Sequence, residues 1–243
     1  MSDQGEGGLL DKVPDPLRYE GHTLNPFEAS GLVVSLVPRG ARVLDVGCGT
    51  GGLAALVRDA SGARVVGVEP DPLRAARARE RGIEVHEGVL TPSLASVLGT
   101  FDVVLYADVL EHLVDPLGEL EKVALFLAPD GVIIISVPNV AHWSVRFNLL
   151  RGRFNYAPTG IMDATHLRWF TSRTLLQLLK RAGFTPVQIK HSSGGFLPCY
   201  QNTMLSRIPT RLRNAAIRRL IKLAPTLFAC QFVMVLRQAG SAN

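Results

Sequence analysis

Acidic residues are missing from the last third of this 243-residue sequence. All 21 Asp and Glu residues lie at or before Asp163, whereas the residues after it include twelve Lys and Arg. The formal charge is therefore −7 for residues 1–163 and +12 for residues 164–243. Such a basic segment either faces solvent or meets an acidic partner, for example a phosphate-bearing substrate, a membrane face or nucleic acid. Composition alone leaves these alternatives open.

Long apolar runs and clustered cysteines are also missing. The most apolar stretch, Val123 to Val137, contains Pro129-Asp130-Gly131 and is shorter than the roughly 20 residues of a membrane-spanning helix. The segment from Met1 to Asp11 is acidic and lacks the basic start of a secretory signal. The three cysteines stand far apart without metal-like spacing, which favours reduced thiols. We therefore expect a cytoplasmic protein.

What is present indicates one α/β domain. The sequence is 47% hydrophobic, which is enough for a core and too much for a disordered chain. Short apolar runs alternate with segments of helical period, and Asp71-Pro72 and Asp115-Pro116 are typical helix starts. The expected strands are residues 42–45, 65–69, 83–86, 101–106, 132–137, 184–191 and 228–237. This alternation predicts a doubly wound, mostly parallel seven-stranded sheet.

Two excursions interrupt the pattern after the fifth strand. Residues 138–170 contain no clear strand, and a loop of this length inside a domain is usually functional. The second excursion carries a basic run from Arg207 to Lys222. We expect an N-terminal extension over residues 1–38 and a domain over residues 39–243. Its insertions, residues 139–170 and 192–227, would form helical cap elements over a substrate.

A glycine-rich turn follows the first predicted strand. Gly47, Gly49 and Gly52 satisfy G-x-G-x-x-G, a weak sign of a dinucleotide site. However, Asp45 would lie close to a pyrophosphate and repel it, whereas it suits a ligand with an ammonium group. Glu69 ends the second strand, where a carboxylate can accept hydrogen bonds from both ribose hydroxyls. These residues predict S-adenosylmethionine, a ribose-bearing cation without phosphate, with a nicotinamide cofactor as the alternative.

Three segments resemble, in order and spacing, the motifs of class I S-adenosylmethionine-dependent methyltransferases. They are Leu44-Asp-Val-Gly-Cys-Gly-Thr-Gly51, Gly67-Val-Glu-Pro-Asp71 and Phe101-Asp-Val-Val-Leu-Tyr-Ala-Asp-Val-Leu-Glu-His112. The resemblance covers roughly residues 40–190 and implies that fold, that cofactor and a methyl-transfer activity. The cofactor-binding residues that it implies are Asp45, Gly47, Cys48, Gly49, Glu69, Pro70, Asp71, Ala107 and Asp108. In one departure, Val89 stands where many members have an acidic residue that accepts the adenine amino group.

Methyl transfer to a hydroxyl requires alignment of the acceptor and removal of a proton, for which histidine suits neutral pH. His112 ends Asp108-Val-Leu-Glu-His112. In similar ubiquinone-pathway O-methyltransferases the matching segment borders the active site, and its acid–acid–His set has been linked to a divalent ion. Asp108, Glu111 and His112 share one side of a helical turn and could form such a set. Alternatively, Asp108 caps the turn and His112 packs beside the cofactor. We assign no metal.

His142 and His166 are further candidate bases in the first excursion. Residues 137–153 and 163–171 resemble a methyltransferase subfamily associated with glycan and secondary-metabolite pathways, in which the second segment lies at the mouth of the acceptor pocket. The resemblance implies substrate contacts for Asp163, His166, Trp143 and Arg168. Asp163 could instead clamp the loop before the next helix. Trp143, Tyr156 and Trp169 form either an aromatic wall for the acceptor or core filling.

The basic run alternates with apolar residues, which predicts an amphipathic helix. We favour its packing as a lid over the site, with contact to an anionic membrane as the alternative. Nucleic acid is not expected, because no recognition motif is present. The sequence thus predicts methyl transfer to a small-molecule hydroxyl of a sugar, phenol or lipid-linked glycan, with an acidic or phosphate-bearing acceptor allowed. The alternative is an accessory protein, because Ser136 to Arg146 resembles proteins associated with methionine biosynthesis.

Overall fold

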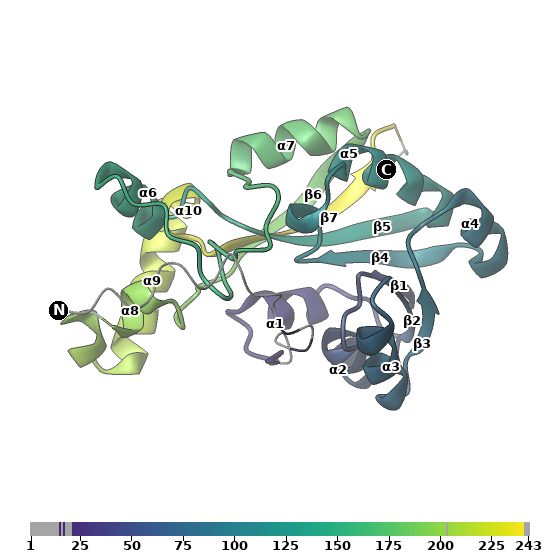
Figure 1. Cartoon of the computed structure of the whole chain (residues 1–243), viewed down its shortest axis with the longest axis horizontal. Coiled ribbons are helices and arrows are strands. Elements are labelled where there is room, and N and C mark those ends of the chain that lie inside the picture. Colours follow the sequence, from purple (N-terminus) through teal and green to yellow (C-terminus); the bar gives the residue numbers. More distant parts are fainter. Residues whose placement is uncertain (1–14, 16, 18–20, 203, 241–243) are drawn as a thin grey trace.

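A seven-stranded sheet forms the centre of the protein, and helices cover both of its faces (Figure 1). This computed structural model describes residues 15, 17, 21–202 and 204–240. Residues Met1 to Asp11 and the start of the predicted N-terminal extension lie outside them. The strands are β1 (Arg42–Val46), β2 (Arg64–Glu69), β3 (Glu84–Glu87), β4 (Phe101–Ala107), β5 (Leu127–Pro138), β6 (Phe184–His191) and β7 (Gln231–Gln238).

The strand order is β3-β2-β1-β4-β5-β7-β6. Strands β1 to β5 pair in parallel, whereas β7 is antiparallel to both β5 and β6. The central strands are almost continuously apolar because both of their faces are buried. The order reverses between β1 and β4, and the loops at such a switch point leave a crevice for ligands. The predicted doubly wound, mostly parallel sheet is confirmed.

Two helical layers cover the sheet, three helices to a layer. On one face lie α1 (Ala29–Val34), α2 (Gly52–Ser61) and α3 (Pro72–Glu80). On the other face lie α4 (Pro92–Leu98), α5 (Pro116–Val123) and α7 (Ser172–Arg181). Each layer has its own core against the sheet, and Figure 1 shows them above and below it.

Three helices begin with the same local device, a capping side chain followed by proline. Asp71 accepts hydrogen bonds from the backbone N–H of Leu73 and Arg74, and Asp115 accepts one from that of Gly118. The sequence predicted these two starts. Helix α4, which was not predicted, is capped in the same way by Thr91 before its proline.

The fifth strand begins earlier than predicted. We expected a turn at Pro129-Asp130-Gly131 and a strand over 132–137, whereas β5 starts at Leu127. The pairing with β4 jumps there from Phe101–Leu127 to Val103–Val132. The turn residues therefore bulge out of a longer strand, because proline cannot donate a ladder hydrogen bond.

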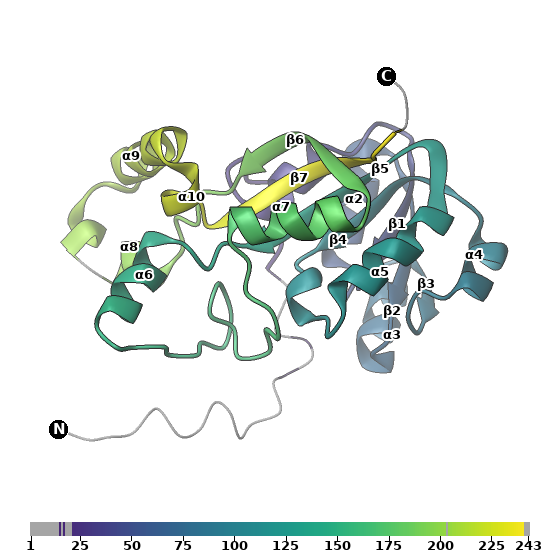
Figure 2. The ribbon, with the colours of Figure 1, turned by 90° about the horizontal axis from the view of Figure 1, so that it is seen from above.

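The two excursions carry short helices that gather at one end of the molecule in both views (Figures 1 and 2). They are α6 (Trp143–Leu150), α8 (Pro198–Gln201), α9 (Thr210–Leu223) and α10 (Pro225–Phe228); the chain also has single turns η1 (Leu110–His112), η2 (Ala124–Phe126) and η3 (Met204–Arg207). On α9, Ile217 and Ile221 enter the core, whereas Leu212 and Leu223 are exposed. Among the described residues, no helix is long and apolar enough to cross a membrane.

Candidate active site

A cavity of about 1210 Å³ lies at the carboxyl ends of β1, β2 and β4. Residues from the N-terminal segment before α1, from both excursions and from the start of β7 complete its wall. This is the crevice expected at the switch point of an open α/β sheet. Of the predicted cofactor-binding residues, all nine line it, namely Asp45, Gly47, Cys48, Gly49, Glu69, Pro70, Asp71, Ala107 and Asp108.

The glycine-rich turn fits tightly between β1, β2 and α3. Gly47 and Gly51 have φ of +68° and +76°, a region that favours glycine. A Cβ on Gly51 would also lie 2.8 Å from the Cβ of Ala78 in α3. The backbone N–H groups of Gly47 and Cys48 donate to the carbonyl of Val68, at 2.7 and 3.2 Å. These contacts hold the turn against the end of β2.

Two carboxylates face the cavity from adjacent strand ends. Glu69 accepts hydrogen bonds from the backbone N–H of Gly49 at 2.9 Å and of Asp71 at 3.0 Å. Asp45 is only 2% exposed, and its Oδ2 has no hydrogen-bond partner among the described residues. Burial, together with the charge of Glu69, raises the pKa of Asp45 to about 7. A cationic ligand would offset this uncompensated negative charge.

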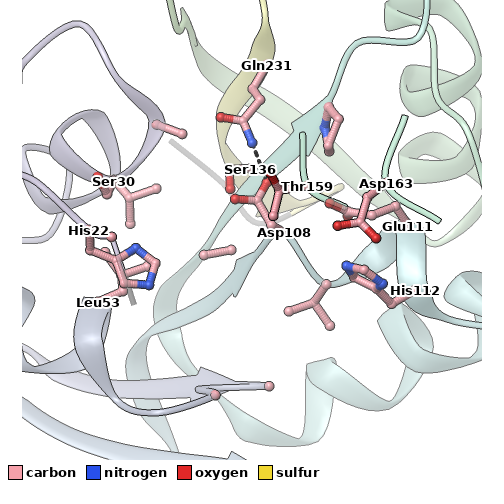
Figure 3. A pocket seen from close by; sticks show the side chains of 18 of the residues that line it. His22, Ser30, Leu53, Asp108, Glu111, His112, Ser136, Thr159, Asp163 and Gln231 are labelled. Atoms are coloured by element: carbon pink, nitrogen blue, oxygen red, sulfur yellow. Dashed lines mark hydrogen bonds between the residues drawn. The ribbon is translucent and has the colours of Figure 1, made fainter. Parts of the chain in front are cut away.

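Asp108, which directly follows β4, lines the cavity beside Ser136 and Gln231 (Figure 3). Asp108 has φ of +56°, and it is the one non-glycine residue with positive φ among those that the structure describes. Such strain is found mainly where the surrounding structure fixes a functional conformation. The side chain of Gln231 in β7 donates to Asp108 Oδ1 at 2.6 Å, and the Asp108 N–H donates to the Ser136 carbonyl.

Near Asp108, the side chains of His112, His166 and the buried Glu111 come together. His112 Nδ1 lies 3.1 Å from the carbonyl oxygen of Thr165, and His166 Nδ1 lies 3.2 Å from that of Ile161. Because a carbonyl only accepts, Nδ1 carries the proton in each neutral ring, which leaves Nε2 as the basic nitrogen. The first excursion thus brings His166 to the turn that holds His112.

Glu111 is 1% exposed, and neither of its carboxylate oxygens has a hydrogen-bond partner within the described part of the chain. Burial raises its pKa well above the ordinary value, and the charges of Asp108 and Asp163 raise it further. Ligand atoms of Glu111, His112 and His166 lie within 4.8 Å of one another. Two imidazoles and an orphaned carboxylate suit a first-row divalent metal. The structure therefore groups His166, rather than the expected Asp108, with Glu111 and His112.

His142 does not reach the cavity, which corrects its assignment as a candidate base. The side chain is fully buried at the start of α6, with Nδ1 2.8 Å from Ser144 Oγ and Nε2 3.3 Å from the Tyr200 hydroxyl. Burial lowers its pKa to about 4. A histidine held in this way links the two excursions, because Tyr200 belongs to α8.

Two predicted substrate contacts also lie outside the cavity wall. Trp143 donates its indole N–H to the Tyr200 hydroxyl at 2.8 Å. Arg168 donates to the carbonyl of Val114 at 2.6 Å. Of the two alternatives for the aromatic residues, the acceptor wall is not formed, because Tyr156 and Trp169 pack against Phe154 outside the cavity lining.

Asp163, by contrast, does line the cavity, and it acts as a clamp as well. Its Oδ1 accepts hydrogen bonds from the backbone N–H and the hydroxyl of Thr165, at 2.8 and 2.6 Å. Thr165 also contacts His112 through its carbonyl. The clamp therefore helps to place the histidine pair.

Sequence reasoning missed several residues of the wall. His22 lines the cavity next to the glycine-rich turn, where a Cβ on Gly52 would lie 2.7 Å from its ring. Arg213 and Asn214 line it from α9. The amphipathic pattern identified that helix, but not which of its basic residues turns inward.

Comparison with known proteins agrees with this geometry. A family model described as a methyltransferase domain matches residues 25–189. The chain belongs to this methyltransferase family. Its relatives include the ubiquinone biosynthesis O-methyltransferases of Ruegeria pomeroyi, 34% identical over 62% of each chain, and of Xanthomonas axonopodis pv. citri, 36% identical over 49% of this chain and 52% of that one. The chain thus matches only half to three fifths of their length. The expected resemblance to ubiquinone-pathway enzymes is confirmed.

Solved methyltransferases share the fold at low sequence identity. A putative methyltransferase of Haloferax volcanii, solved with its activator, matches with a TM-score of 0.58 at 18% identity, over 87% of this chain and 89% of that one. A possible histamine N-methyltransferase of Thermotoga maritima, described as SAM-dependent, matches with a TM-score of 0.51 at 24% identity, over 68% and 73%. A Burkholderia thailandensis N-methyltransferase with bound S-adenosylhomocysteine matches with a TM-score of 0.51 at 22% identity, over 89% and 78%. The expected methyltransferase fold is confirmed.

Proposed function

We propose that this chain is an S-adenosylmethionine-dependent methyltransferase that methylates a hydroxyl of a small molecule. The observation that carries the proposal is that the carboxylates of Asp45 and Glu69 line the same cavity as the His112 and His166 pair. The first pair suits a cationic nucleoside, and the second suits removal of a proton from an acceptor.

The cofactor-binding wall would use charge and ribose recognition. Asp45, with no partner on Oδ2 among the described residues, would bind the ammonium of the methionine end. Glu69 already orients Gly49 and Asp71 and ends β2, where it can accept from ribose hydroxyls. When bound, the sulfonium supplies an activated methyl group and a good leaving group. Val89 lines the same cavity but has no polar side chain for the adenine amino group.

The histidine pair would position and deprotonate the acceptor. His112 and His166 both line the cavity, and either Nε2 can take the hydroxyl proton. Alternatively, Glu111 and the two histidines hold a divalent metal that lowers the pKa of the hydroxyl. Asp163 and Thr165 would keep the histidine pair in place in either case.

An oxygen acceptor is favoured by the two relatives, which are named for O-methylation in ubiquinone biosynthesis. A phenol is therefore the first acceptor class to test, followed by sugars and lipid-linked glycans. None of the three cysteines forms a disulfide, and two of them are buried, which supports a reducing, cytoplasmic location.

The test measures S-adenosylhomocysteine formed from S-adenosylmethionine with catechol, simple phenols and sugars as acceptors. We expect turnover with at least one hydroxylated compound and none with the matching methyl ether. Tight binding of the cofactor without turnover on any hydroxyl would contradict the enzyme and favour the accessory role. Binding of NAD in place of S-adenosylmethionine would contradict both.

A further inference from the structure

Arg213 is buried in the cavity wall without a partner among the described residues. It lies near the start of α9, and it is 6% exposed. Its Nε is buried without a hydrogen-bond partner, and within the part of the chain that the structure describes no hydrogen bond or ion pair joins its guanidinium. Arg213 lines the cavity together with Thr210 and Asn214.

This state is costly for an arginine. A guanidinium stays charged at any physiological pH, so burial cannot be offset by loss of a proton. Buried charges in proteins are therefore normally paired. Arg213 differs in this from Arg42 and Arg79, which are exposed and still have partners, the Thr100 carbonyl and Glu87. A missing partner beside a cavity indicates that the partner is the ligand.

The surroundings of Arg213 favour an anion. The second excursion, residues 192–227, contains no Asp or Glu, and the first turn of α9 has no acidic residue to meet the positive end of the helix. Glu28 lines the same cavity, where its Oε1 accepts from the Ser193 hydroxyl at 2.8 Å and its Oε2 has no partner among the described residues. The described part of the chain shows no ion pair between Glu28 and Arg213.

We propose that Arg213 binds an anionic oxygen group, a carboxylate or a phosphate, carried by the methyl acceptor. This inference rests on the proposed function for the identity of the ligand as acceptor. The guanidinium can bind two oxygens of such a group at once, which fixes the orientation of the molecule as well as its charge. The acceptor would then reach from α9 to the histidine pair across one cavity.

Calorimetric titration with phenyl phosphate, benzoate, inorganic phosphate and neutral benzyl alcohol tests this site. Each probe is titrated with and without saturating S-adenosylhomocysteine. We expect the wild-type protein to bind phenyl phosphate or benzoate at least tenfold more tightly than benzyl alcohol. Tighter binding of phenyl phosphate than of benzoate assigns a phosphate, and the reverse order assigns a carboxylate. Binding of inorganic phosphate alone, without either aromatic anion, would contradict an acceptor site.

Arg213→Met should abolish the preference for anions, and Arg211→Met, at an exposed position on the same turn of the helix, should keep it. Because Met removes an unpaired buried charge, the ligand-free variant should unfold at the same temperature as the wild type or higher. A lower unfolding temperature together with unchanged anion binding would show a structural role and overturn the proposal. If Arg213→Met does not fold, Arg213→Gln, of similar length, must show the same loss.

Separate results would contradict the methyltransferase assignment and the anion site at Arg213. Absence of S-adenosylhomocysteine binding contradicts the methyltransferase assignment, while the anion titrations without it still test Arg213. Equal anion binding by the wild type and Arg213→Met contradicts the anion site and leaves the methyltransferase assignment intact.

Discussion

The imidazole rings of His112 and His166 lie edge to face, with their centroids 4.8 Å apart. His112 ends the turn after β4, whereas His166 comes from the long first excursion. Both Nδ1 atoms lie against backbone carbonyls, which leaves Nε2 as the basic nitrogen of each ring, and both residues line the cavity. The excursion between β5 and α7 thus brings a second imidazole to the turn after β4.

Replacement of the two histidines should separate a base from a supporting residue. We expect His112→Ala or His166→Ala to lower kcat by about 10²- to 10⁴-fold, with the larger loss in the residue that takes the proton. His86→Ala serves as the control, because His86 in β3 lies outside the cavity wall and is partly exposed, so this variant should leave kcat within a few-fold. Equal losses in all three variants, at equal cofactor affinity, would contradict the assignment.

Chelation and replacement of Glu111 should show whether the histidine pair acts as a general base or binds a metal. If Glu111, His112 and His166 hold a divalent ion, dialysis against a chelator should remove activity, and a first-row metal should restore it. Glu111→Gln should then lower metal affinity by about 10-fold or more. If no metal is held, chelation leaves the rate unchanged, and Glu111→Gln should stabilise the protein because it removes a buried acid with a raised pKa.

Asp45, which we expect to bind the cofactor, should lower the free energy of unfolding of the ligand-free protein. Its pKa is about 7 in the folded protein, against 3.8 for an ordinary exposed aspartate. Between pH 3.8 and about pH 7, Asp45 holds its proton more tightly in the folded state than in the unfolded state. The contribution of Asp45 to the free energy of unfolding therefore falls as pH rises through this range, and it stays low at higher pH. Asp45→Asn should therefore unfold at a higher temperature than the wild type at pH 8. Unfolding temperatures of both proteins at pH 5 and pH 8 check this, and a lower value for the variant at pH 8 would contradict it.

Glu69 should matter for affinity more than for folding. Glu69→Ala removes a carboxylate that would bind the ribose, and charge-assisted hydrogen bonds contribute about 1.5–3 kcal/mol each. We expect cofactor affinity to fall by at least tenfold in calorimetry. Glu87→Ala, an exposed acid at the end of β3, is the control and should keep wild-type affinity. Wild-type affinity in Glu69→Ala would remove the ribose assignment.

The sheet and the cofactor wall were predictable because their signals are local. Strand length, glycine spacing and the caps at Asp71 and Asp115 all lie within a few residues of the feature they specify. Helix α4 carried the same signal at Thr91-Pro92 and could have been found by the same rule. Asp45 and Glu69 could each be identified from a single motif, because each lies at the end of a strand next to that motif.

The acceptor side was less predictable because packing between distant segments decides it. His142 and His166 are both in the first excursion, yet one is buried against Tyr200 and the other lines the cavity. Nothing near His142 in the sequence reveals a partner 58 residues away. The inward turn of Arg213 depends in the same way on how α9 packs, since Ile217 and Ile221 on the same face enter the core.

The cavity should bind S-adenosylmethionine through the carboxylates at the ends of β1 and β2. Calorimetric titration at pH 6 in buffers of different ionisation enthalpy tests this binding. Because Asp45 is largely protonated at pH 6 and its charged form suits the cation, binding should release protons, so the heat should depend on the buffer, and affinity should rise toward pH 8. No heat with S-adenosylmethionine or S-adenosylhomocysteine, from the folded protein at either pH, would contradict the account.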